Sequence, residues 1–211
     1  TRIFTPAEYG VLILILAISG PVGTVVVEWA AQAVGRYYAE YWQRGDIDTF
    51  LSAIVLLCAI LFISIPLLGV AAWAVFRAVN YHPPIVLFIS VIALVIVQGP
   101  YALVSRVLPA RFNAQAYRRA TILLACLSLS FSLAFIGISG RDVIWIIWGT
   151  VLANLIVIIY VAHQAELSLH PLQRHVDPEI FATIHRFASY GFPLTAYFLT
   201  SSLLVIGDRY V

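Results

Sequence analysis

Polar residues whose types and spacing suit ligand binding lie directly after the first apolar run of the chain. Glu28, Gln32, Arg36 and Glu40 recur at every fourth position. In a helix this spacing stacks side chains on one slowly drifting face, so we predict a polar stripe. Within it, Arg36 can pair with Glu40 or Gln32, or bind the phosphate of an anionic lipid. The alternative interpretation is an ordinary interfacial helix end whose arginine extends back to the water.

Two further sets of residues accompany the stripe. Small side chains lie directly before the last three stripe residues, at Ala31, Gly35 and Ala39. They predict a close approach of another helix. Amphipathic aromatic residues are typical of the membrane–water boundary. The stretch contains Tyr37, Tyr38, Tyr41 and Trp42. We therefore expect a closely packed helix that continues beyond the hydrocarbon of the bilayer.

The composition excludes a soluble domain. Of the 211 residues, 62% are hydrophobic and 10% are charged, whereas roughly 25% are charged in an average soluble domain. The apolar residues fall in runs of about 20, the length of a helix that crosses a bilayer. We predict an all-α fold, a polytopic transmembrane helix bundle with six spans. These spans cover approximately residues 9–27, 50–75, 85–104, 121–138, 143–161 and 190–206.

Capping and proline residues mark the starts and bends of these spans. Thr5 and Pro6 suit the N-cap and the first position of the first helix. Pro21, Pro66 and Pro100 lie within apolar runs. Each removes one backbone hydrogen bond, so each predicts a kink.

The distribution of arginine orients the bundle, because cytoplasmic loops are enriched in basic residues. All twelve basic residues are Arg. The loops after the first, third and fifth spans contain Arg36, Arg44, Arg106, Arg111, Arg118, Arg119, Arg174 and Arg186. The opposite side contains Arg2, Arg77, Arg141 and Arg209. We therefore predict a multi-pass protein of the cell membrane with residues 31–49, 105–119 and 163–189 in the cytoplasm.

The other reactive side chains match no known site motif. Cys58 and Cys126 lie in apolar runs and are interpreted as small buried side chains. The histidines of the last predicted cytoplasmic loop have no zinc-binding spacing. They are His163, His170, His175 and His185. Nucleophile motifs, phosphate-binding glycine loops and dense basic blocks are not found either. We expect no enzymatic activity, no cofactor, no metal and no nucleic-acid partner.

Four short motifs occur in order along nearly the whole chain. They are FTPAEYG at 4–10, GRYYAEY followed by GD between 35 and 46, an R…RFNAQAY segment at 106–117, and YGFPL at 190–194 followed by GDRY at 207–210. Their order and spacing resemble the polysaccharide-export (oligosaccharide flippase) family of the MATE-like flippase superfamily. The chain departs from the family pattern at Gly207, where Ser is commoner.

The resemblance implies a fold and a function. The six spans correspond to helices two to seven of a protein of twelve or fourteen, so we expect the sequence to be a fragment. Residues 1–189 then form most of an N-terminal six-helix bundle, and 190–211 begin a second bundle across a central cavity. Members of the family move lipid-linked oligosaccharides on polyprenyl pyrophosphate from the cytoplasmic to the outer leaflet, for surface polysaccharides such as lipopolysaccharide. The expected partners are the bilayer, this substrate and polysaccharide-assembly proteins.

The candidate substrate-binding residues follow from the stripe and its arginine-rich face, not from a family motif. We predict that Arg36 first, and then Arg118, contacts the pyrophosphate, with Gln32 and Glu28 lining the cavity.

Other classes of protein remain as alternatives. A cation-coupled drug or metabolite antiporter of the same superfamily needs a carboxylate within or beside a span, and Glu28 is the candidate. A membrane-embedded polysaccharide polymerase or ligase needs a long outer loop with catalytic Arg or His. A scaffold protein without transport activity is the third alternative.

Overall fold

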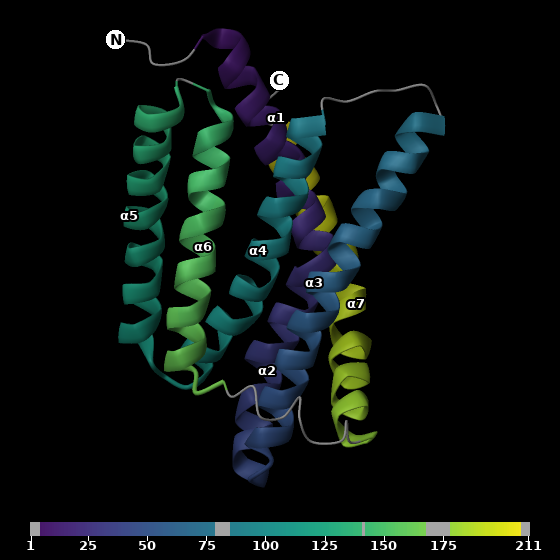
Figure 1. Ribbon diagram of the computed structural model, residues 1–211. Coiled ribbons are helices and arrows are strands. Elements are labelled where there is room, and N and C mark those ends of the chain that lie inside the picture. The colour runs from purple at the N-terminus through teal and green to yellow at the C-terminus, as the bar shows by residue number, and fades with distance from the viewer. Residues whose placement is uncertain (1–4, 79–84, 141, 168–177, 208–211) are drawn as a thin grey trace.

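The computed structural model describes residues 5–78, 85–140, 142–167 and 178–207. These residues form helices joined by short turns, with no strand among them (Figure 1). The elements are α1 (Pro6–Gly23), the π-helical turn η1 (Thr24–Glu28), α2 (Trp29–Arg44), α3 (Ile47–Ala78), α4 (Ile85–Ala110), α5 (Ala114–Ser139), α6 (Ile144–Gln164) and α7 (Pro178–Gly207). The predicted all-α fold is confirmed.

Among the described residues, five helical stretches are long and apolar enough to cross a membrane. They are Glu8–Arg44, Ile47–Ala78, Phe88–Ala110, Ala114–Ser139 and Ile144–Gln164. They overlap the first five predicted spans over nearly their whole lengths, which makes the chain a polytopic bundle. The sixth predicted span, residues 190–206, lies within α7, and its membrane crossing stays a prediction.

The helices run up and down between two ends of the bundle (Figure 1). α5 and α6 lie side by side, and α4 packs between α6 and the group of α1, α2 and α3. α7 packs against α2, α3 and η1. The α2–α3 turn, the α4–α5 turn and the start of α7 lie at the same end. We call this the predicted cytoplasmic end, because the Arg count assigns its loops to the cytoplasm.

The first helix begins with the predicted cap. The Thr5 backbone N–H donates to Glu8 Oε2 at 2.6 Å, and the Glu8 backbone N–H donates to Thr5 Oγ1 at 3.3 Å. Pro6 occupies the start of the helix, where no intrahelical partner for its nitrogen is needed. This reciprocal pair is a capping box, so the local sequence signal for the start of α1 is confirmed.

The first helical stretch continues well beyond its apolar run. α1 passes through Pro21 and is followed at Thr24 by the π turn η1, after which α2 extends to Arg44. Proline lacks the backbone N–H that donates a hydrogen bond in an α-helix. The hydrogen bond missing at Pro21 explains why the wider, π-helical hydrogen bonding of η1 follows it. The expected continuation of this helix past its apolar run is confirmed, and its position relative to the hydrocarbon of a bilayer stays a prediction.

Gly45 ends α2 and sets the turn into α3. Its φ is +79°, a left-handed conformation that favours glycine. The Gly45 N–H donates to the Trp42 carbonyl at 3.2 Å, and the Asp46 N–H donates to the Tyr41 carbonyl at 3.1 Å. α3 then begins at Ile47, and the chain reverses within two residues.

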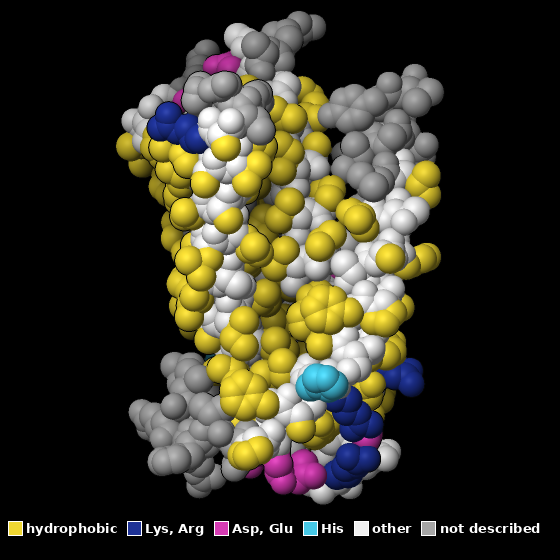
Figure 2. All heavy atoms as spheres, turned by 90° about the vertical axis from the view of Figure 1, so that its right-hand side faces the viewer, with side chains coloured by type: hydrophobic (Ala, Val, Ile, Leu, Met, Phe, Trp, Pro, Cys, Tyr) yellow, Lys and Arg dark blue, Asp and Glu magenta, His cyan; other side chains and the backbone are white. Residues whose placement is uncertain are grey.

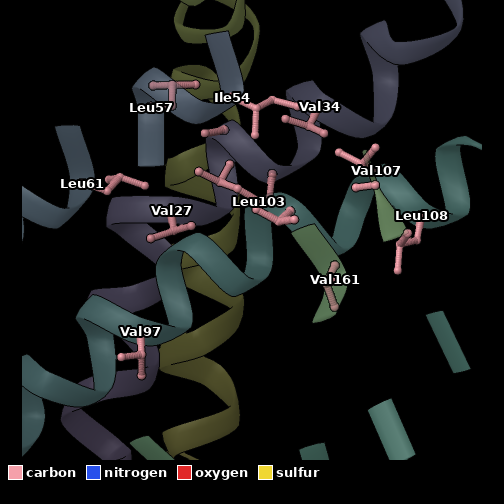
Figure 3. Close-up of a cluster of buried hydrophobic side chains, with 14 of the residues drawn as sticks. Val27, Val34, Ile54, Leu57, Leu61, Val97, Leu103, Val107, Leu108 and Val161 are labelled. Atoms are coloured by element: carbon pink, nitrogen blue, oxygen red, sulfur yellow. The ribbon is translucent and has the colours of Figure 1, made fainter. Parts of the chain in front are cut away.

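The core is hydrophobic, and its aliphatic part lies between α2, α3, α4 and α6 (Figure 3). Buried side chains that meet there include Val34, Ile54, Leu57, Leu103, Val107 and Val161. The outer surface is also apolar, and Figure 2 shows a broad band of hydrophobic side chains between charged ends. An apolar surface around an apolar core is typical of a bundle whose solvent is lipid.

Candidate functional site

The two faces of α2 have different environments. One face is covered by α3, α4 and α7. Its buried residues are Trp29, Ala30, Ala31, Ala33, Val34, Tyr38 and Tyr41. On the other face Gly35, Arg36 and Ala39 are exposed, and Gln32 is half-buried. Within the described part of the chain, this second face stays largely open between α4 and α7, and we call it the polar face of α2.

The η1 end of the polar face carries a three-residue polar cluster. Gln32 Nε2 donates to Glu28 Oε1 at 2.7 Å, as the four-residue spacing predicts. Arg106 Nη2, from α4, donates to the same Glu28 oxygen at 3.0 Å. The carboxylate charge is therefore neutralised by a residue 78 positions away in the sequence.

Arg36 lies one helical turn beyond this cluster and contacts aromatic rings. Its guanidinium carbon is 4.9 Å from the centre of the Tyr190 ring and 6.0 Å from that of Tyr37. Among the described residues it forms no ion pair. Cation–π contact attracts the guanidinium without neutralising its charge, so the cation stays available to an anion.

The predicted cytoplasmic end of α2 carries an ion-pair cluster. Glu40 Oε1 accepts from Arg44 at 2.6 Å and from Arg186 of α7 at 2.9 Å. The Arg186 guanidinium also lies 4.6 Å from the centre of the Tyr37 ring. Hydrogen bonding to the Glu40 carboxylate is the main cause that raises the Arg186 pKa above its ordinary value, although partial desolvation opposes the change. The expected partner Glu40 is thus bound to Arg44 and Arg186 instead of Arg36.

Helix geometry explains why one stripe meets two different helices. Four residues advance an α-helix by slightly more than one turn, so each step of the stripe rotates by about 40°. At Glu28 the stripe points toward α4, and three steps later Glu40 points toward α7. The drift that the spacing predicts therefore carries the polar face from one flanking helix to the other.

α7 approaches α2 closely at Gly191. A Cβ atom at this position would collide with the carbonyl oxygen of Trp29. Next to it, the rings of Trp29 and Phe192 stack with centres 4.9 Å apart and planes 11° apart. Glycine is needed here because any side chain would push the backbones of α2 and α7 apart.

A polar cleft of about 310 Å³ opens at the predicted cytoplasmic end, between the α2–α3 turn and α7. Its polar lining includes Tyr41, Arg44, Asp46, Glu179 and Arg186. The Tyr41 hydroxyl and Thr183 Oγ1 lie 3.0 Å apart and link α2 to α7. The cleft contains both cationic and anionic side chains, so it does not select one sign of charge.

The structure brings three of the four predicted site residues to one face. Glu28 and Gln32 are hydrogen-bonded to each other, and Arg36 lies on the same face of α2. Arg118 is exposed on the first turns of α5, and no contact within the described residues joins it to the other three. Sequence reasoning missed Arg106, which it had assigned to a loop because the predicted span ended at residue 104.

Several predictions of packing were wrong. Ala31 is buried, but Gly35 and Ala39 are exposed, and a Cβ at Gly35 would meet nothing within 4 Å. Cys58 is half-buried and Cys126 is exposed, so the expected burial of Cys126 is not found.

Two of the sequence observations fall partly outside the described residues. His163 and His185 are exposed, whereas His170 and His175 lie outside the described residues. The end of the GDRY motif, residues 208–210, also lies outside them.

Comparisons with protein-family models, characterised proteins and solved structures find no match to this chain.

Proposed function

We propose that the chain is part of a transporter that flips lipid-linked oligosaccharides across the cell membrane for surface polysaccharide synthesis. The observation that carries the proposal is Arg36, a cation without a carboxylate partner among the described residues, on the open polar face of α2. Charged groups near membrane-spanning segments are costly unless a cavity or partner compensates them. A pyrophosphate supplies that partner, with bidentate hydrogen bonds to a guanidinium.

The surroundings of Arg36 suit such a substrate. Gln32 and Glu28 offer hydrogen-bonding groups on the η1 side, and Tyr190 provides a ring on the α7 side. Sugars bind through such amide, carboxylate and aromatic groups, while the polyprenyl tail needs an apolar surface beside them. Figure 2 shows such an apolar surface above the charged end. The reaction is translocation, so no covalent step is required of these residues.

The wider arrangement belongs to the same proposal. Residues 1–189 form most of one bundle, and 190–211 begin a second, in a protein of twelve to fourteen spans. Segments 31–49, 105–119 and 163–189 face the cytoplasm, where the substrate is loaded onto the polar face. Polysaccharide-assembly proteins act before and after this step.

The antiporter alternative is less favoured because of one contact. A cation-coupled carrier needs a carboxylate that is free to bind the coupling ion, and Glu28 is the candidate. The ion pair with Arg106 already supplies a positive charge to Glu28. Neither a polymerase nor a scaffold needs Arg36 for its activity. Substitution of Arg36, described below, therefore distinguishes both alternatives from a flippase.

The test replaces Arg36 in the full-length protein and measures surface polysaccharide in cells that lack the native copy. Arg36→Ala is expected to lower export at least about tenfold, because a hydrogen bond to a charged group contributes roughly 1.5–3 kcal/mol. Arg36→Lys keeps the charge but loses the planar guanidinium. Its export is expected to lie between that of the wild type and that of Arg36→Ala. Arg119→Ala, at an exposed Arg of α5, is the matched control. Wild-type export by Arg36→Ala at equal membrane abundance would contradict the proposal.

A further inference from the structure

The contact between Glu28 and Arg106 uses little of the binding capacity of either group. One carboxylate oxygen, Glu28 Oε1, accepts from both Arg106 Nη2 and Gln32 Nε2. A guanidinium offers five N–H donors and can bind an oxyanion through two of them at once. Within the described residues, Arg106 uses one nitrogen. The pair is therefore a single-point contact that a better-matched anion can replace.

The position of the pair allows such a replacement. The Arg106 side chain is 44% exposed, and the Glu28 side chain is 26% exposed. Glu28 lies at the junction of η1 and α2 on the same helix as Arg36, about 12 Å away along the axis. Arg106 reaches this face from α4, whereas the ring over Arg36 comes from α7. Two guanidinium groups thus flank the turn of α2 that carries Gln32.

We propose that Arg106 is a second binding residue for the substrate pyrophosphate and that Glu28 occupies it while the site is empty. This inference rests on the proposed function and names a residue and an exchange that the function alone does not require. When the pyrophosphate binds, its oxygens replace the Glu28 carboxylate on Arg106, and Glu28 keeps its hydrogen bond from Gln32. When the substrate leaves, Glu28 returns to Arg106.

The exchange has a physical advantage for a carrier that must also return empty. An unpaired charge beside a span is costly, and the empty site would otherwise hold two uncompensated arginines. Glu28 neutralises Arg106 in the empty site, so no residue from outside the site is needed to do so. It also competes with the substrate, so it weakens binding and speeds release.

The roles can be separated by a double-mutant cycle. Glu28→Gln keeps the size of the side chain and an acceptor for Gln32 but removes the competing charge. It is expected to tighten pyrophosphate binding about tenfold and to slow export, because release becomes slower. Arg106→Gln is expected to weaken binding at least about tenfold. In the double variant, Glu28→Gln should no longer change the affinity, since its effect operates through Arg106.

The experiment uses the purified full-length protein in nanodiscs and geranylgeranyl pyrophosphate as the probe. The dissociation constant is measured by tryptophan fluorescence, with geranylgeranyl monophosphate as the comparison ligand. The melting temperature of each variant is measured first, and Glu28→Ala replaces Glu28→Gln if the latter does not fold. Export is measured in parallel for the same variants.

The outcomes distinguish this inference from the proposed function. Tighter binding by Glu28→Gln that disappears in the double variant supports the exchange. Unchanged affinity in Glu28→Gln, with normal binding by the wild type, overturns the exchange and leaves the flippase proposal standing. Equal tightening with and without Arg106 also overturns it, because Glu28 then acts elsewhere. No pyrophosphate binding by the wild type overturns both proposals.

Discussion

Two helix interfaces of this bundle, α5–α6 and α2–α7, are both close but are built from different groups. At α5–α6, Ser128 Oγ and Thr150 Oγ1 lie 2.9 Å apart, and Ser132 Oγ donates to the Ile146 carbonyl at 3.1 Å. These contacts are uncharged and lie within the apolar parts of two spans. At α2–α7, the hydroxyl contact between Tyr41 and Thr183 is accompanied by an ion pair between Glu40 and Arg186 and by stacked aromatic rings. Phe192, whose ring stacks on that of Trp29, is 61% exposed.

The difference separates structural contacts from exchangeable ones. Small residues and hydroxyl groups hold helices together in lipid by van der Waals contact and short hydrogen bonds, which do not depend on salt. Charged contacts at an exposed edge are weaker and can be replaced by other ions. We infer that α5–α6 is a fixed unit of the fold, whereas the polar face of α2 and its flanks are the part suited to binding.

The largest effect is expected from filling the α5–α6 contact. In Gly149→Ala, the new Cβ would lie 2.5 Å from the backbone nitrogen of Ser132. The colliding atoms are mainly backbone atoms of α5, which cannot rotate away as a side chain can, so overpacking should cost about 1–3 kcal/mol. This cost is measured as the decrease in the free energy of unfolding of the variant in mixed micelles. Gly137→Ala, where the Cβ meets nothing within 4 Å, is the control, and equal stability of the two variants would show that the contact is not close.

A smaller effect is expected at the corresponding glycine of α2–α7. Gly191→Ala places a Cβ against the Trp29 carbonyl, but α7 can shift outward toward its exposed side. We expect a loss of about 1 kcal/mol, at the low end for overpacking. Gly35→Ala, on the open face, should be neutral or slightly stabilising, because alanine favours a helix. The same unfolding measurement applies, and a larger loss for Gly35→Ala would reverse the assignment of the two faces.

The smallest effect is expected from the ion pairs at the end of α2. Glu40→Gln keeps the oxygen that accepts from Arg44 and Arg186 but removes the charge. Exposed pairs contribute about 0.2–1 kcal/mol each and are screened by salt. The wild type should therefore lose its small advantage over the variant when NaCl is raised to about 1 M. An advantage that persists at high salt would place this cluster with the fixed contacts of α5–α6.

Local features of the fold could be predicted from the sequence because they depend on neighbouring residues. The Thr5–Glu8 capping box, the continuation of α2 and the Glu28–Gln32 hydrogen bond all join residues within one or two helical turns. The fold class could be predicted from the apolar runs for the same reason. Each spanning helix satisfies its own backbone hydrogen bonds, so it forms independently of its neighbours.

The partners of these elements could not be predicted, because they depend on which helices meet. Gly35 and Gly191 look equally suited to close packing, but α7 covers the turn of α2 that carries Trp29 and leaves Gly35 open. Arg106 lies beyond an apolar run and resembles an interfacial arginine until α4 is placed beside α2. A rotation of about 100° for each residue decides whether such a side chain meets lipid, water or a carboxylate.

The π turn at Thr24–Glu28 has a consequence for how the chain tolerates changes in length. Its hydrogen bonds reach one residue further than those of an α-helix, so the turn holds about one residue more than regular geometry requires. Removing one residue from Val25–Val27 would let the turn close into ordinary α-helix while α1 and α2 keep their present faces. The same deletion in the middle of α4 would rotate one half of that helix by about 100°. The bundle thus carries a spare position in the backbone, directly before the residues on which its proposed activity depends.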